Sequence, residues 1–351
     1  MIKEAIQKVV NKEDLKEQEM IEVMTEIMSG LATEAQIASF ITALRMKKET
    51  PQEITAAVKV LRQFMIPVRL IRDRYIDKEI TKVDYDTILD TCGTGGDSSN
   101  TFNISTAVAF VVSGCGVFVA KHGNRSISSL CGSADVVEQL GIKLEITKEQ
   151  AEKCLSEIGI VFLFAPLWHP AMKYAIGPRR QIGIRTIFNI IGPLSNPAFA
   201  NAQVLGVYSE ELVKIVAEVL KNLNIKHGFV VYGKEDRTDE ISITGETIIA
   251  EIKDGKIDFF NVYPEKYGIK RASLEQLRGS TPQENAKIIL DILSGKEKGP
   301  KRDVVLLNSA FALLAANKVK SIEEGIKLAI DSIEKGYALR KLELLKKYTN
   351  E

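Results

Sequence analysis

A glycine-rich stretch between a predicted strand and a predicted helix could bind a phosphate group. It reads DTCGTGGDSSNTFNIST at residues 90–106 and has glycine at positions 93, 95 and 96. Glycine lets backbone N–H groups converge on a ligand, and the following helix adds the positive end of its dipole. No Lys-Ser/Thr pair ends the stretch, and Ser98 replaces the third glycine of a dinucleotide-binding loop. We therefore expect a phosphate or pyrophosphate here, not NAD or a nucleotide in an ordinary P-loop.

A second polar stretch, KHGNRSISSLCGSAD at residues 121–135, follows a predicted strand. Its lysine, arginine and hydroxyl groups suit a polyanion, and Lys121 can act as a point charge on a phosphate. A single histidine in a loop, such as His122, is more often a packing or hydrogen-bonding group than a general base. Such a basic loop alone is usually only solvated. We expect this one to lie beside the glycine-rich stretch, at the end of a neighbouring parallel strand.

Two adjacent carboxylates, Asp239 and Glu240, follow a further predicted strand in the sequence DRTDE at residues 236–240. Adjacent carboxylates make a poor all-protein cage for Mg²⁺, but they suit a magnesium ion that brings its own phosphate ligands and waters. A solvated turn is the alternative for this motif in isolation. Its position on the same sheet edge as the two phosphate-type stretches favours a magnesium role.

Several arginines lie in residues 177–197, GPRRQIGIRTIFNIIGPLSNP, at positions 179, 180 and 185. A guanidinium group can hold a planar carboxylate through two hydrogen bonds. An organic acid lodged in a cleft between domains would suit such a group. Arginines that merely face solvent are the alternative.

The composition indicates a folded protein without a strong overall charge. Of 351 residues, 45% are apolar and 26% charged, and the net charge is +1. No whole-protein field steers the chain toward nucleic acid or an anionic membrane. The longest weakly polar run, residues 107–120, is too short to cross a membrane, and the charged N-terminal segment lacks the apolar core of an export signal. We expect a cytoplasmic protein.

Cysteine and histidine spacing argues against a transition-metal site built by the protein. No CxxC or HExxH pattern occurs, so we expect reduced, mostly buried thiols. The residues concerned are Cys92, Cys115, Cys131, Cys154, His122, His169 and His227.

Hydrophobic periodicity predicts the elements that must position these residues. Up to residue 66 apolar residues recur at helical spacing, and capping boxes at Thr33 and Thr50 start two helices. From about Asp86, helical stretches alternate with short apolar runs, which indicates βαβ units. The predicted strands are residues 87–89, 117–120, 203–208 and 228–232.

The remaining segments add a hairpin and further helices. Asp254-Gly255, between two β-rich runs, predicts an antiparallel ribbon within residues 241–263. Residues 169–191 resemble the N-terminal helices in composition and are expected to dock onto them. Helices are expected from Thr281, Lys301 and Ser321.

Four stretches together resemble the signatures of the anthranilate phosphoribosyltransferase family, and the resemblance covers nearly the whole chain. They are AQIASF with ALR at residues 35–45, GTGGD with TFNIST, KHGNRSISS with GSAD, and GIRTIFNIIGPLSNP. The resemblance implies an α/β fold: a small all-helical subdomain plus a large domain with a mostly parallel β-sheet flanked by helices. The helical subdomain would be residues 1–68, with 169–191 docked onto it. The phosphoribosyl-pyrophosphate-binding domain would be residues 86–168 and 192–351.

The resemblance also implies an activity, namely transfer of the phosphoribosyl group of phosphoribosyl pyrophosphate to the amine of anthranilate in tryptophan biosynthesis. It implies Mg²⁺ and a homodimer formed through the helical subdomain. From the balanced charge and the short apolar runs we expect no nucleic-acid or membrane partner. No acid or base catalyst is implied, and Lys121, Asp239 and Glu240 would act electrostatically.

The resemblance also implies site residues, which are those at the matching motif positions. The residues expected to bind phosphoribosyl pyrophosphate are Gly93, Thr94, Gly95, Gly96, Asp97, Thr101, Asn103, Ser105, Thr106, Lys121 and Ser133. Those expected to bind anthranilate are Gly93, His122, Gly123, Asn124 and Arg179. Those expected to serve magnesium are Ser105, Asp239 and Glu240.

The chain departs from the family pattern before the carboxylate pair. Arg237 and Thr238 stand where the family usually has glycine and a small or apolar residue. We expect Arg237 to pair with Asp236 and point away, which would leave the carboxylates free. Residues 70–86 are longer and more charged than the usual connector and receive no role.

Two other functions are considered. A pyrimidine nucleoside phosphorylase would resemble the same architecture, but the KHGN loop and GIRTIFNIIGPLSNP argue against it. A non-catalytic relative that binds nucleic acid is disfavoured by the balanced charge and by the retained phosphate-type stretches.

Overall fold

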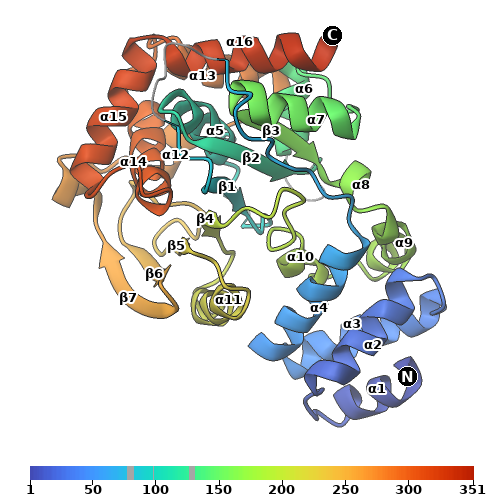
Figure 1. The fold of residues 1–351 in the computed structure, drawn as a ribbon. Helices are drawn as coiled ribbons and strands as arrows, with labels where there is room; N and C mark the ends of the chain where they lie inside the picture. Colours follow the sequence, from blue (N-terminus) through green and yellow to red (C-terminus); the bar gives the residue numbers. More distant parts are fainter. Residues whose placement is uncertain (77–82, 98, 126–130) are drawn as a thin grey trace.

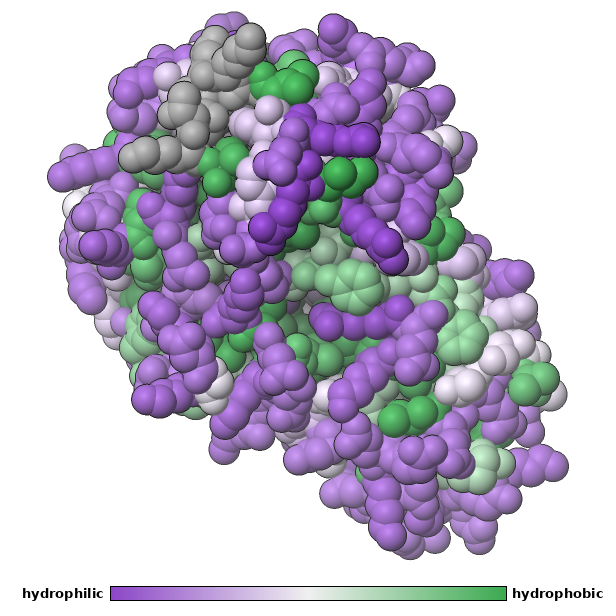
Figure 2. All heavy atoms as spheres, viewed as in Figure 1, coloured by the Kyte–Doolittle hydropathy of each residue, from purple (hydrophilic) through white to green (hydrophobic). Residues whose placement is uncertain are grey.

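The protein consists of a small helical body and a larger body built on one sheet (Figure 1). The computed structural model describes residues 1–76, 83–97, 99–125 and 131–351. Ser98, part of the 70–86 connector and residues 126–130 of the KHGNRSISSLCGSAD stretch therefore lie outside the described residues. Figure 2 shows hydrophilic side chains over most of one face, with hydrophobic side chains gathered where the two bodies meet.

Four N-terminal helices form the helical body. Both predicted capping boxes are present: Thr33 and Gln36 exchange backbone-to-side-chain hydrogen bonds, as do Thr50 and Glu53. The predicted starts of the third and fourth helices are thus confirmed. The helices are α1 (Ile2–Val10), α2 (Glu17–Met28), α3 (Glu34–Lys47) and α4 (Pro51–Phe64).

A seven-stranded sheet, in the order β3-β2-β1-β4-β5-β6-β7, organises the larger body. The first five strands in this order run parallel, and β6 and β7 form the predicted antiparallel ribbon around Asp254-Gly255. The strand at 160–164 was not predicted, because a short continuous apolar run fits a buried helix as well as a strand. The strands are β1 (Ile88–Gly93), β2 (Phe118–Gly123), β3 (Ile160–Phe164), β4 (Ala202–Gly206), β5 (His227–Gly233), β6 (Thr247–Lys253) and β7 (Lys256–Val262).

Successive side chains of the central strands enter two different apolar cores. Val204 and Phe229 pack with the helices on one face, whereas their neighbours Leu205 and Val230 belong to a core that is continuous with the helical body. The two-residue period of a strand produces this division. The helical body is thereby joined to the sheet by a shared core.

Helices cover both faces of the sheet. The helix after β1 is apolar around its whole circumference and packs against the C-terminal helices. Helices begin after the predicted caps Thr281 and Ser321, and one begins at Pro300, one residue before its predicted start. These helices are α5 (Ile104–Gly114), α6 (Ser133–Gln139), α7 (Lys148–Lys153), the π-helix η1 (Cys154–Ile158), α11 (Glu210–Asn222), the short η3 (Pro264–Tyr267), α12 (Leu274–Leu277), α13 (Pro282–Leu293), α14 (Pro300–Ala315), α15 (Ile322–Glu334) and α16 (Tyr337–Asn350).

After β3 the chain returns to the helical body. The helix over residues 173–182 packs against α2 and α3, and the next one contacts α4. These elements are α8 (Ala165–Trp168), the short η2 (Pro170–Met172), α9 (Lys173–Ile182) and α10 (Phe188–Ile191). Within the described part of the chain, no helix has the length and apolar character needed to cross a membrane.

Candidate active site

The three polar stretches meet at the carboxyl ends of the parallel strands, as the βαβ pattern predicts. The glycine-rich stretch follows β1, and residues 236–240 follow β5. The strand prediction for the second stretch was too short, since Lys121, His122 and Gly123 are the last residues of β2 and not part of a loop. They pair with residues 162–164 of β3, the strand that the sequence did not reveal.

The carboxylate pair is held against the glycine-rich stretch by backbone hydrogen bonds. Asp239 Oδ2 accepts a hydrogen bond from Gly95 N at 2.8 Å. Glu240 Oε1 accepts one from Ser105 N at 3.2 Å, at the start of α5. Both predicted metal-binding carboxylates therefore lie beside the predicted phosphate-binding residues.

Glycines make this approach possible. A Cβ on Gly93 would lie 2.2 Å from Asp239 Oδ2, and a Cβ on Gly206 would lie 1.6 Å from the carbonyl oxygen of Asp239. At Gly206 the clash is with the backbone, so that position requires glycine. At Gly93 the clash is with the carboxylate of Asp239, which would have to move from its contact with Gly95. Gly206, at the end of β4, was not among the predicted site residues.

Negative charge accumulates at this point. Burial and the nearby carboxylate of Asp97 raise the pKa of Asp239 to about 7. Burial and the charge of Asp239 raise the pKa of Glu240 well above its ordinary value. Like charges held this close favour a bound cation.

These donors fit a magnesium ion that is only partly coordinated by protein. Among the described residues, no group of three or more His, Cys, Asp or Glu side chains is arranged to hold a metal. Two hard carboxylates, Asp239 and Glu240, remain for a cation that obtains its other oxygen ligands elsewhere. This donor set agrees with the sequence argument that phosphate oxygens and waters would complete the coordination.

Lys121 reaches from β2 toward the start of α5. Its Nζ donates to the carbonyl oxygen of Thr91 at 2.5 Å and to Ser105 Oγ at 3.1 Å. Burial lowers the pKa of Lys121, whereas the carboxylates of Asp90 and Glu240 oppose that shift. The ammonium group thus lies beneath the helix start where a phosphate is expected.

Asp90 was missed by the sequence analysis. It lies in β1 and is fully buried; its carboxylate accepts hydrogen bonds from Asn196 Nδ2 at 2.8 Å and His122 N at 3.3 Å. Burial raises the pKa of Asp90 to about 6. The predicted strand 87–89 ended before Asp90, but β1 continues to Gly93, and the network that Asp90 forms fixes the end of β2.

Asn308 of α14 was also missed. Its Oδ1 accepts from Ile241 N at 3.0 Å, and its Nδ2 donates to the carbonyl oxygen of Ile241 at 2.8 Å. The backbone directly after Glu240 is therefore fixed from the helical layer. No local pattern in the sequence could show this, since the contact spans 67 residues.

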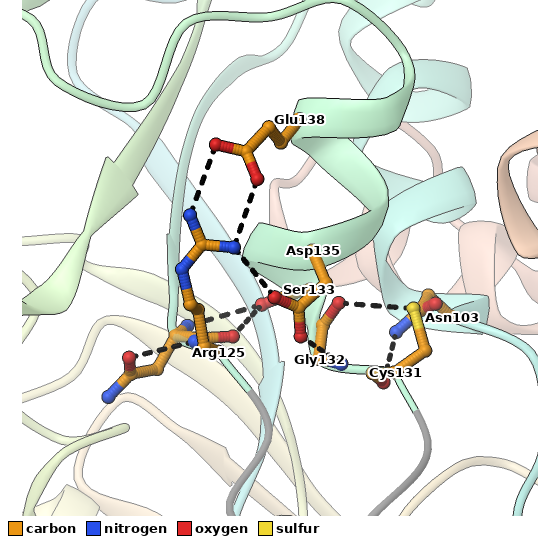
Figure 3. Close-up of polar contacts among 8 residues, drawn as sticks. Asn103, Arg125, Cys131, Gly132, Ser133, Asp135 and Glu138 are labelled. Carbon is orange, nitrogen blue, oxygen red and sulfur yellow. Dashed lines mark hydrogen bonds and ion pairs between the residues drawn. The ribbon is translucent and has the colours of Figure 1, made fainter. Parts of the chain in front are cut away.

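The polar residues of the glycine-rich stretch have different surroundings. Asn103 donates to the carbonyl oxygen of Cys131 at 3.2 Å, which links this stretch to the start of α6 (Figure 3), and accepts from Asn285. Thr101 lies near Ser99, with 3.4 Å between the hydroxyl oxygens. Among the described residues, the buried hydroxyl oxygens of Thr94 and Thr106 have no hydrogen-bond partner.

Two buried histidines lie side by side near the end of β2. The ring centroids of His122 and His169 are 5.0 Å apart, and in the described residues His122 Nε2 and both ring nitrogens of His169 lack partners. Burial lowers the pKa of His122 well below its ordinary value and that of His169 to about 4. Both rings are therefore neutral at pH 7, and the lowered pKa makes each ring a weak proton acceptor.

The arginines separate into different environments. Arg179 is half-buried and its guanidinium lies 5.4 Å from the ring centroid of Phe188. Arg180 is exposed. Arg185, for which no individual role was predicted, donates to the carbonyl oxygen of Gly96 and thus reaches the glycine-rich stretch.

The expectation for Arg237 is half right. Its side chain is exposed and leaves the carboxylates free, but no ion pair joins it to Asp236 in the described structure. Asp236 instead accepts hydrogen bonds from Thr238 and Ser242. Arg237 has a φ of 57°, a left-handed conformation that favours glycine.

Two family models match the chain and correspond to its two bodies. The helical bundle domain of the glycosyl transferase family matches residues 3–65, and the a/b domain of that family matches residues 85–339. Fold and site together define a two-domain glycosyl transferase.

Relatives that match over the whole chain identify the family within this class. The chain is 57% identical over 352 residues to an anthranilate phosphoribosyltransferase of Geobacter sp. (strain M21), covering 100% of this chain and 99% of the relative. The crystal structure of the Thermus thermophilus enzyme has a TM-score of 0.90, 39% identity and 99% coverage of both chains. The Saccharomyces cerevisiae enzyme, in complex with PRPP and Mg, has a TM-score of 0.87, 29% identity and coverage of 99% and 98%. This chain belongs to the anthranilate phosphoribosyltransferase family, as its motifs predicted.

Proposed function

We propose that this protein transfers the phosphoribosyl group of phosphoribosyl pyrophosphate to the amine of anthranilate and releases pyrophosphate, a step of tryptophan biosynthesis. The observation that carries the proposal is the meeting of Asp239 and Glu240 with the backbone of the glycine-rich stretch. A pyrophosphate there would lie between backbone donors, Lys121 and a cation. The S. cerevisiae relative in complex with PRPP and Mg supports these two ligands.

The chemistry requires charge stabilisation more than a strong nucleophile. Pyrophosphate becomes a good leaving group once its developing charge is offset, and Mg²⁺ supplies part of that positive charge when bound. Asp239, Glu240 and Ser105 would hold the metal, while Lys121 would face the departing phosphates. We expect an oxocarbenium-like ribose, attacked by an aromatic amine of low basicity that needs no prior deprotonation.

We propose the same substrate contacts that the motifs predict. Phosphoribosyl pyrophosphate would be bound by residues 93–97 with Thr101, Asn103, Thr106 and Ser133. Anthranilate would be bound by Gly93, His122, Gly123 and Asn124, with Arg179 on its carboxylate. The burial of Arg179 strengthens a charge-assisted hydrogen bond to that carboxylate.

We also propose the wider setting of the enzyme. Residues 1–68, with 169–191 docked onto them, would form the subdomain through which two copies associate, in a cytoplasmic enzyme. Exposed apolar side chains on the helical body, Val10, Leu31 and Met46, suit a homodimer contact. Light scattering of the purified protein tests the dimer.

Anthranilate fluorescence tests the reaction directly. The purified protein is mixed with anthranilate, phosphoribosyl pyrophosphate and Mg²⁺, and each component is omitted in turn. We expect a fluorescence decay that requires all of them. No decay, with folded protein and measured binding of phosphoribosyl pyrophosphate, would reject anthranilate as acceptor.

A further inference from the structure

Arg125 lies two residues after the end of β2, and its side chain crosses to helix α6 (Figure 3). Nη1 donates to Asp135 Oδ1 at 2.8 Å and to Glu138 Oε2 at 3.0 Å, and Nη2 donates to Glu138 Oε1 at 3.1 Å. Asp135 and Glu138 are three residues apart and share one face of the helix. Both terminal nitrogens of the guanidinium are therefore engaged by carboxylates.

One of these carboxylates, that of Asp135, also fixes the start of α6. Asp135 Oδ2 accepts a hydrogen bond from Gly132 N at 2.9 Å, so its two oxygens hold the first turn of the helix and Arg125 together. The guanidinium carbon of Arg125 also lies 5.7 Å from the ring centroid of Phe164, at the end of β3. These contacts give Arg125 one defined position although its side chain is partly exposed.

The contacts continue into two proposed substrate-binding residues. Arg125 N donates to Asn124 Oδ1 at 2.8 Å, which fixes the orientation of that amide. Asn124 N donates to Ser133 Oγ at 3.3 Å, and the carbonyl oxygen of Asn124 accepts from Ala134 N at 3.1 Å. Asn124, proposed for anthranilate, and Ser133, proposed for phosphoribosyl pyrophosphate, are thus joined beside the ion pairs.

We propose that Arg125 is a positioning residue and is not itself a phosphate ligand. Its ion pairs with Asp135 and Glu138, called the clasp below, join the end of β2 to α6. They thereby hold Asn124 and Ser133 in fixed relative positions. The proposal rests on the proposed function, because it concerns how those residues meet substrate. A phosphate would have to displace Glu138 from a two-point contact. Bidentate ion pairs within a network are stronger than isolated surface pairs.

A charge exchange tests this role. Arg125→Glu and Glu138→Arg each break the clasp, whereas the double variant restores an ion pair with reversed polarity. We expect each single variant to lower kcat/KM for anthranilate and for phosphoribosyl pyrophosphate about ten-fold, and the double variant to recover most of that loss. Lys287→Glu, which breaks the exposed pair with Asp291 on α13, is the matched control and should change neither value.

Amide hydrogen exchange of residues 131–138 supplies a readout independent of turnover. Exchange should accelerate in both single variants and slow again in the double variant. If the double variant is as impaired as Arg125→Glu while Glu138→Arg alone is active, Arg125 binds substrate directly and the proposal is wrong. Wild-type activity in all variants would equally overturn it.

The two proposals can fail separately. If the wild-type protein consumes no anthranilate, the proposed reaction fails. Calorimetry then measures the binding of phosphoribosyl pyrophosphate to the wild type, the two single variants and the double variant. Together with the exchange rates, these affinities decide whether the clasp positions Ser133.

Discussion

The side-chain oxygen Oδ2 of Asp239 lies 2.8 Å from the backbone nitrogen of Gly95, although 144 residues separate them in the sequence. The hydrogen bond joins the segment after β5 to the glycine-rich stretch after β1. It uses Oδ2 of the carboxylate. A cation and a phosphate chain would therefore be held by elements that already touch one another.

Removal of either carboxylate should weaken metal binding and lower turnover together. We expect Asp239→Ala and Glu240→Ala to lower kcat at least ten-fold and to raise the Mg²⁺ concentration needed for half-maximal rate. Magnesium titrations at saturating substrates measure both effects. Glu235→Ala, at an exposed position in the same turn, serves as control. An unchanged magnesium requirement in both variants would discard the metal role.

A methyl group at residue 206 should displace the carboxylate pair. The Cβ in Gly206→Ala would meet the carbonyl oxygen of Asp239 at 1.6 Å, so the segment must shift. We expect a fall in kcat/KM of about a hundred-fold, as misplacement near 1 Å can cause. Gly192→Ala is the control, because the nearest atom to its new Cβ lies 3.8 Å away. Equal activity of the two variants would contradict this geometry.

Arg179 should act on one substrate only. Arg179→Ala removes the proposed carboxylate contact, so KM for anthranilate should rise about ten-fold or more while KM for phosphoribosyl pyrophosphate changes little. Steady-state kinetics with each substrate varied in turn give both constants. The neighbouring, exposed Arg180→Ala is the matched control. Equal effects of Arg179→Ala on both constants would reject the assignment.

Asp90 should make stability depend on pH in a defined direction. Its pKa of about 6 in the folded protein lies above the ordinary value of 3.8, so the folded state retains the proton longer than the unfolded state. The contribution of the Asp90 carboxyl group to the free energy of unfolding is largest below pH 4. It falls as the pH rises to about 6 and then levels off. The loss amounts to about 3 kcal/mol at most. Denaturant unfolding of the wild type and Asp90→Asn across this range should show a smaller slope for the variant.

Local features of the sequence predicted the elements well. The caps at Thr33 and Thr50 depend on residues three positions away, so the sequence contains the whole signal. The convergence of the polar stretches followed from the parallel arrangement of their strands. The fold class and the family were predicted correctly because several ordered motifs agreed.

Contacts between residues far apart in the sequence could not be predicted from local features. The role of Asn308 depends on its contact with Ile241, which is visible only once α14 is placed beside that residue. The role of Asp90 likewise depends on its hydrogen bond with Asn196, which is distant in the sequence. The false pairing of Arg237 with Asp236 has a similar cause. Adjacent opposite charges suggested an ion pair, but the hydroxyl groups of Thr238 and Ser242 are better placed for the carboxylate.

The sheet order has a consequence for synthesis on the ribosome. β1 pairs with β2 and also with β4, which leaves the ribosome more than a hundred residues later. A nascent chain that ends before β4 exposes one edge of β1 to other chains, which is a template for misassembly. The carboxylate segment gains its support from Asn308 later still. A prematurely terminated product would therefore contain every phosphate-type motif and still be inactive.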